Sequence, residues 1–209
     1  MVMPMSKKSE KDYPRAIVVF GAPGVGKGTQ IKLLEEYLTK NDQEILSIGT
    51  GGLFRDMMEN QTSTTRDLVA DAMMKGDVLP VFLPISLWSQ KLREAYQKNA
   101  VLIADGFPRR SIEAQVLDTA YDFYGIDTVE VVSIGLDDEE IVTRLMSRGR
   151  GDDTREVIMH RLDQYRQETL PVMDYFKENA QRYRITSING SGTVDEVHEA
   201  IITQLGMFQ

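Results

Sequence analysis

A glycine-rich string directly follows an apolar run near the start of the chain, and this junction limits the possible folds more than any other feature. The run AIVVF, residues 16–20, has the composition of a buried strand, and the string GAPGVGKGTQ, residues 21–30, leads into a helical pattern. Glycines let backbone N–H groups surround phosphate oxygens, the next helix offers its positive end, and the lysine supplies an ammonium. The spacing therefore predicts a phosphate-binding loop. The predicted contacts are Gly24, Val25, Gly26, Lys27, Gly28 and Thr29.

Gly28 departs from the usual phosphate loop, which reads G-x-x-x-x-G-K-[ST]. In that pattern a hydroxyl follows the lysine and binds Mg²⁺ beside the phosphates. Here the position after Lys27 has no side chain, and Thr29 stands one residue further on. The sequence thus poses the question of which phosphate chemistry uses bare backbone where a magnesium ligand is usual.

Short apolar runs alternate with longer helical patterns along the rest of the chain. Besides residues 16–20, these runs are 44–48, 101–104, 129–134 and 184–188. Strands that alternate with helices predict βαβ units, so we expect an α/β fold with a parallel sheet covered by helices on both faces. The helical stripes are expected at 31–38, at 157–176 as one long helix, and at about 194–205.

A chain of 209 residues is long enough for one ordinary domain. Residues 1–14 are polar, contain two prolines and are predicted to form a flexible arm, so that residues 15–209 make up the domain. Residues from about 47 to 83 are rich in methionine and lie between two predicted strands. We interpret this stretch as a helical insertion.

Composition excludes several classes of function. The chain has no cysteine, which rules out disulfides, thiolate catalysis and a cysteine-ligated zinc site. Its net charge of −8 argues against a broad surface for nucleic acid or acidic lipid. No apolar run approaches the roughly 20 residues of a membrane span. We therefore expect a cytoplasmic protein, monomeric, with small-molecule partners and with neither nucleic acid nor membrane among them.

A second motif, VLIADGFPRR, occupies residues 101–110 and places an acid where a strand pattern ends. In a parallel sheet the carboxyl end of such a strand lies beside the phosphate loop. A carboxylate in that position can hold hydrated magnesium near the phosphates. Asp105 is therefore the candidate metal residue.

The loop G-x-x-G-x-G-K-G-T and the string D-G-F-P-R resemble the nucleoside monophosphate kinase family, most closely the short-lid adenylate kinases. The resemblance covers nearly the whole chain from Arg15 onward. It implies a P-loop NTPase-type three-layer fold with a five-stranded parallel sheet, a helical NMP-binding insertion and a lid, trimmed here to about 148–153. It also implies reversible transfer of the γ-phosphoryl group from Mg·ATP to a nucleoside monophosphate, most simply AMP. In that family the metal is held through water and acidic side chains, which answers the question posed by Gly28 and assigns Mg²⁺ to Asp105.

Arginines cluster between residues 144 and 166 of this acidic chain. Phosphoryl transfer between two polyanions requires several cations around the moving group. The pattern R-x-x-x-R-x-R-x-D-D, followed by a further arginine, resembles the family's lid region, so the resemblance implies that Arg144 flanks the donor's adenine. Arg155 and Arg166 lie outside the pattern and are expected to form ordinary ion pairs. The catalytic residues implied by the resemblance are Lys27, Arg109, Arg148, Arg150 and Arg161, and those implied for NMP binding are Thr50, Arg55, Gly106, Arg109 and Glu113.

The sequence departs from the family pattern in three places. The lid is shorter than in the family's short-lid members. Gly52 stands where the family's T-G-D-x-[LF]-R motif has an acid. Glu113 stands where a glutamine reads the acceptor base, and a carboxylate can only accept hydrogen bonds, which suits guanine's two donors or, less well, cytosine's amino group. The alternative is that Glu113 turns to solvent and Gln115 takes its place.

These departures leave other functions open. One alternative is a kinase for GMP, CMP or UMP, and another is a catalytically weakened nucleotide-binding protein on the same fold. A third alternative is a P-loop switch or hydrolase. However, the chain has no N-K-x-D string to read a guanine base, and this alternative does not explain why the D-G-F-P-R string is present.

Overall fold

The computed structural model describes residues 13–149 and 153–207. Nearly all of the predicted arm and the centre of the predicted lid, including Arg150, lie outside the described residues.

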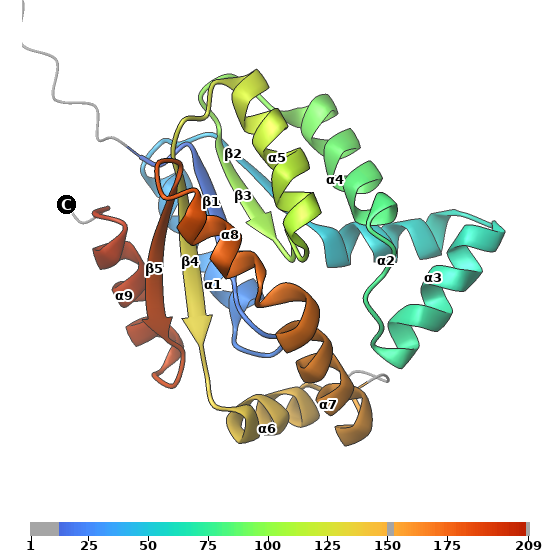
Figure 1. Ribbon diagram of the computed structural model, residues 1–209. Helices are drawn as coiled ribbons and strands as arrows, with labels where there is room; N and C mark the ends of the chain where they lie inside the picture. Colours follow the sequence, from blue (N-terminus) through green and yellow to red (C-terminus); the bar gives the residue numbers. More distant parts are fainter. Residues whose placement is uncertain (1–12, 150–152, 208–209) are drawn as a thin grey trace, which may run out of the picture.

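The described residues form a five-stranded parallel sheet with helices on both faces, which confirms the predicted fold class (Figure 1). The strand order is β2-β3-β1-β4-β5. The strands are β1 (Ala16–Phe20), β2 (Ile45–Gly49), β3 (Val101–Asp105), β4 (Val129–Gly135) and β5 (Tyr183–Asn189). Each predicted apolar run matches one strand to within a residue or two, because strands buried on both faces read as continuous β-branched runs.

Two apolar cores, one on each face of the sheet, hold the three layers together. On one face lie α1 (Lys27–Lys40), α6 (Asp138–Arg148), α7 (Arg155–Gln164) and α9 (Val194–Gln204). On the other lie α4 (Phe82–Ala95), α5 (Ser111–Tyr124) and α8 (Val172–Glu178). In Figure 1 the helices α6 and α7 cross below the carboxyl ends of the strands.

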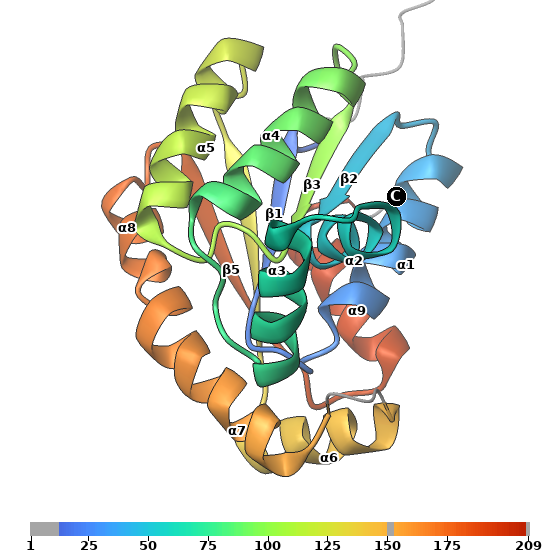
Figure 2. The same cartoon turned by 90° about the vertical axis from the view of Figure 1, so that its right-hand side faces the viewer.

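Part of the predicted insertion forms two helices that project from the sheet, α2 (Thr50–Asn60) and α3 (Thr64–Lys75) (Figures 1 and 2). Together with the start of α4 they enclose a small core of their own, made of Phe54, Met57, Val69 and Leu83. Met58 and Met73 pack against it, whereas Met74 is exposed. Much of the methionine content here is therefore packing.

The single long helix predicted over 157–176 is wrong. The segment is α7, then a π-helical turn at Tyr165–Thr169, then α8. Pro171 has no N–H to donate and fixes its own backbone, so a regular helix is interrupted before it. The turn also changes the face that the chain covers, because Ile158 and Leu162 pack in one core and Val172 and Phe176 in the other.

Candidate active site

A cleft of about 2130 Å³ lies at the carboxyl ends of the central strands. Pockets for one small ligand are about 300–1,000 Å³, so this cleft has room for two nucleotides. It brings together predicted residues from the glycine loop, from α2, from the D-G-F-P-R string and from α6 and α7. They are Gly24, Val25, Gly26, Lys27, Gly28, Thr29, Arg55, Asp105, Gly106, Arg109, Arg144, Arg148 and Arg161.

The glycine loop joins β1 to α1, and its backbone conformation and close packing disfavour residues other than glycine at two positions. Gly26 caps α1 in the left-handed region at φ 101° and provides no side-chain cap. At Gly24 a Cβ would lie 2.7 Å from Leu145 Cγ, so the loop packs directly on α6. The first turn of α1 thus presents uncapped backbone at the positive end of the helix, which is a favourable position for an anion.

Lys27 lies at the start of α1 and folds back over the loop. Its ammonium donates hydrogen bonds to the carbonyls of Gly21 and Ala22, both at 2.8 Å. Burial lowers the pKa of Lys27 to about 8, with a contrary contribution from Asp105 and further lowering from Arg109 and Arg148. A polyanion beside this ammonium would favour the charged form.

Gly28 is free of any internal steric requirement. A Cβ built on it meets no atom within 4 Å, and its φ is not positive. Neither packing nor backbone conformation within the described residues therefore requires glycine at this position. The residue lines the cleft, so the space above it is kept for whatever the loop binds.

Asp105 ends β3 and lies in register with Gly49 and Val19 of the neighbouring strands. It lines the cleft and makes no hydrogen bond or ion pair with another described residue. No group of three or more Asp, Glu, His or Cys side chains within residues 13–149 and 153–207 could hold a metal ion. The carboxylate of Asp105 at the cleft fits Mg²⁺, which binds through one or two carboxylates together with substrate phosphates and water. Gly52 lies across the cleft with open space around its Cβ position.

The predicted acceptor residues meet where β3 faces the start of α2. Thr50 donates from its hydroxyl to the carbonyl of Gly106 at 3.0 Å, and the Arg109 Nε donates to the same carbonyl at 2.9 Å. Arg55 stands one turn along α2, next to Gly51, and reaches the cleft. Two guanidinium groups therefore approach one region from different elements.

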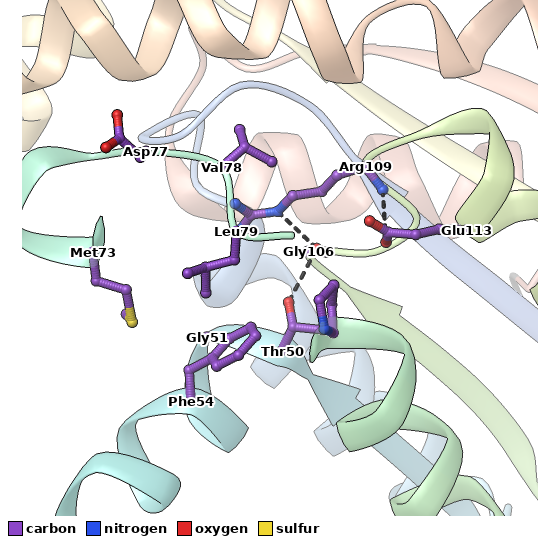
Figure 3. A pocket seen from close by; sticks show the side chains of 11 residues that line it. Thr50, Gly51, Phe54, Met73, Asp77, Val78, Leu79, Gly106, Arg109 and Glu113 are labelled. Carbon is purple, nitrogen blue, oxygen red and sulfur yellow. Dashed lines mark hydrogen bonds between the residues drawn. The ribbon is translucent and has the colours of Figure 1, made fainter. Parts of the chain in front are cut away.

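A smaller cavity of about 70 Å³ opens beside these residues, and Glu113 lies in its wall (Figure 3). Glu113 is buried, and its Oε2 accepts a hydrogen bond from the backbone N–H of Arg109 at 3.1 Å. Gln115 is exposed. The alternative in which Glu113 turns to solvent and Gln115 replaces it is therefore wrong.

Two arginines of the lid region share one carboxylate as their acceptor. Asp153, whose side chain is fully buried, accepts two hydrogen bonds from Arg148 at 2.9 Å each and one from Arg161 at 3.0 Å. Arg144 instead donates to Glu140 and to the carbonyl of Gly190.

Arg155 and Arg166 form the ion pairs expected of them. Arg155 pairs with Glu139, and Arg166 pairs with Asp138 and Asp163.

Several contacts at the site were missed by sequence reasoning. Arg161 also donates to the carbonyl of Met73 at 3.3 Å, and the His160 ring contacts Asp77 Oδ1 at 2.7 Å, so α7 touches the end of α3 across the cleft. The π-helical turn brings Thr169 to the cleft as well. Only the proline after this turn signals it in the sequence, and no local pattern indicates the contacts between α7 and α3.

No described helix has both the length and the apolar character that crossing a bilayer demands.

Comparison with known proteins agrees with the geometry of the cleft. The family model for adenylate kinase matches residues 19–181. The adenylate kinase of Prochlorococcus marinus (strain MIT 9211) is 37% identical, over 91% of this chain and 97% of its own. The adenylate kinase of Mycolicibacterium paratuberculosis and adenylate kinase 1 of Nostoc sp. are each 35% identical, over 91% of this chain and 98% of theirs. Together with the glycine loop and the arginine-lined cleft, these matches establish that the chain belongs to the adenylate kinase family of phosphotransferases.

Proposed function

We propose that the protein transfers the γ-phosphoryl group of Mg·ATP to AMP, reversibly, to form two molecules of ADP. The observation that carries this proposal is the cleft, where cations from both sides face one space. Lys27 and Arg148 line the cleft from the glycine loop and α6, and Arg161 lines it from α7, next to the end of α3. Arg55 and Arg109 line it from α2 and from the D-G-F-P-R string. The relatives named above are adenylate kinases, which supports AMP as the acceptor.

On the donor side, the glycine loop binds the triphosphate through its backbone, and Lys27 moves from the carbonyls of Gly21 and Ala22 to phosphate oxygens. Arg148 and Arg161 stabilise the charge on the transferred group, held at a fixed separation by Asp153. Arginines in such a position contribute about 10³–10⁵ in rate in phosphoryl-transfer enzymes. Arg150, which lies outside the described residues, stays a predicted member of this group. Arg144 stands next to Gly190, at the edge predicted for the adenine.

On the acceptor side, Arg55 and Arg109 hold the monophosphate in line with the donor. No side chain needs to act as a nucleophile, because the acceptor phosphate is already anionic. Asp105 would hold Mg²⁺ through water, and the ion would supply charge neutralisation between the phosphates. The roles of these residues, and the division into arm, insertion and lid, stay predictions, as do a cytoplasmic location and a monomeric state.

The test is formation of nucleoside diphosphate from Mg·ATP with AMP, GMP, CMP and UMP in parallel, with Lys27→Ala as the blank. AMP turnover above the blank is expected. Turnover with another monophosphate alone would correct the acceptor. If ATP binds and no acceptor is used, the chain is a nucleotide-binding protein, and release of phosphate without an acceptor would mean a hydrolase.

A further inference from the structure

Glu113 is a buried carboxyl group with little to stabilise its charge. Its relative exposure is 1%, its only hydrogen bond within the described residues is the one from Arg109 N–H, and it has no ion pair there. A buried carboxylate normally has a cation or several donors around it. Glu113 therefore lacks the partners that an ionised side chain needs in this environment.

The cavity beside Glu113 combines apolar walls with one polar end, which is the chemistry of a nucleobase site, and Met73, Gly106 and Arg109 of its lining also line the large cleft. Its apolar walls come from α2, from α3, from the segment that leads into α4 and from α4 itself, and they are formed by Phe54, Met73, Val78, Leu79 and Pro84. Figure 3 shows Glu113 on one side of the cavity, with its carboxyl group next to the backbone nitrogen of Arg109 and with Gly106 between it and Leu79. A nucleobase placed between these walls would present its polar edge to the carboxyl group.

The charged groups around the cavity are largely engaged elsewhere. Arg110 donates to Glu168 at 2.6 Å and to the carbonyl of Leu79 at 3.2 Å. Asp77, the other carboxyl group in the cavity wall, contacts His160 of α7. Burial raises the pKa of Glu113, and the Arg109 N–H and the charges of Arg109 and Arg110 offset this only in part. A base that covers the carboxyl group would remove more water and favour the neutral form further.

We propose that Glu113 selects the acceptor base by its own protonation, so that the protonated carboxyl group binds adenine and the carboxylate binds guanine. A protonated carboxyl group has an O–H donor beside a carbonyl acceptor, as an amide has a donor beside an acceptor. It therefore matches adenine, whose edge offers the ring N1 acceptor beside the N6 amino donor. The carboxylate accepts only, and it matches the two adjacent N–H donors of guanine. This inference rests on the proposed function and specifies the base that the same site accepts at a given pH.

The mechanism makes binding of the two acceptors respond to pH in opposite ways. Above the pKa of Glu113, AMP binding must take up a proton, so its apparent affinity falls roughly tenfold for each pH unit. GMP binding needs no such proton. The ratio of the two kcat/KM values isolates this effect, because the acceptor phosphate and Lys27 titrate in the same way for both substrates.

The experiment measures kcat/KM for AMP and for GMP between about pH 5 and pH 8.5, the range in which a raised glutamate pKa is expressed. In the unmodified protein the AMP-to-GMP ratio is expected to fall with pH, approaching roughly tenfold per unit. In Glu113→Gln, whose amide does not titrate, the ratio is expected to stay high and constant. Asp77→Asn is the matched control, since it neutralises the other carboxyl group of the cavity, and it is expected to keep the slope.

A second readout does not depend on turnover. Calorimetric titration of AMP, in two buffers of different ionisation enthalpy and at a pH above the pKa of Glu113, is expected to show a proton uptake in the unmodified protein that Glu113→Gln lacks. The phosphate and Lys27 contribute equally in the two proteins. A constant AMP-to-GMP ratio in the unmodified protein, or a slope that Asp77→Asn removes and Glu113→Gln keeps, would overturn the proposal. Absence of diphosphate with every acceptor at every pH would instead refute the proposed kinase function.

Discussion

Asp153 binds Arg148 in a bidentate ion pair, with both N···O distances at 2.9 Å, and the same carboxylate also accepts from Arg161. The Asp153 side chain is fully buried, whereas those of Arg148 and Arg161 are 36% and 16% exposed. The carboxylate thus lies beneath two guanidinium groups that face the cleft. Their spacing is set by the end of α6 and the middle of α7 together.

Replacing Asp153 by Asn is expected to lower both stability and turnover. The amide loses an ionic acceptor while two arginines remain next to it, which lowers the free energy of unfolding by about 1–3 kcal/mol. Displaced arginines lower kcat by about 10²-fold. Asp138→Asn is the control, because it removes an ion pair with Arg166 in which both side chains are nearly half exposed, and it should change stability by less than about 0.5 kcal/mol. Equal effects of the two variants on denaturant unfolding would contradict this role of Asp153.

Replacing Gly28 by Ala is expected to make the protein more stable and to weaken its binding of ATP. A methyl group there meets no protein atom within 4 Å, and alanine favours the first turn of α1, so the free energy of unfolding rises by up to about 1 kcal/mol. In the proposed ATP complex the same methyl group would meet the phosphates, and KM for ATP should rise by about tenfold or more, as for an overpacked contact. Gly26→Ala is the contrast, because its φ of 101° makes alanine strained and lowers stability. An unchanged KM for Gly28→Ala would show that nothing binds over this residue.

Replacing Gly52 by Asp is expected to lower the Mg²⁺ concentration that the reaction needs. A side chain at Gly52 has open space in the cleft, and Asp in the first turn of α2 also stabilises the helix dipole by about 0.3–1 kcal/mol. Titration of Mg²⁺ at fixed ATP should reach half-maximal rate at a lower concentration in Gly52→Asp. Gly52→Asn has the same size without the charge and should leave the midpoint where it is in the unmodified protein. Equal midpoints in all three proteins would place the metal away from α2.

Lys27 should make stability depend on pH in a defined direction. Its pKa is about 8 in the folded protein and about 10.4 when unfolded, so between these values the unfolded chain binds more protons. The contribution of Lys27 to the free energy of unfolding therefore rises with pH between these two values, and it is lowest below pH 8. Lys27→Met removes the effect and should be more stable than the unmodified protein at pH 7, by up to about 3 kcal/mol. Denaturant unfolding at intervals up to pH 10 measures the difference in free energy of unfolding between Lys27→Met and the unmodified protein. This difference should shrink as pH rises, and a constant difference would mean that the pKa of Lys27 is not lowered.

The sheet could be predicted because its information is local. Every residue of β1 is buried, so the strand reads as an unbroken apolar run, and the glycine string that follows is typical of a strand-to-helix turn that binds phosphate. The helical stripes of α1 and α9 are equally local, since one face of each packs on the sheet.

The tertiary structure alone decided which residues meet. The stripe from Val157 to Phe176 reads as one helix, yet its two halves serve opposite faces of the sheet, and only a π-helical turn beside a proline connects them.

Asp153 and Glu113 are buried, but the residues next to them in the sequence do not indicate it. The first is buried beneath two arginines of different helices, and the second lines a cavity whose other walls come from α2, α3, α4 and the segment before α4. The sequence by itself determined the strands, the glycine loop between β1 and α1, and the family, because short-range patterns carry them. The burial and the partners of these acids depend on contacts between distant segments, which exist only once the chain has folded.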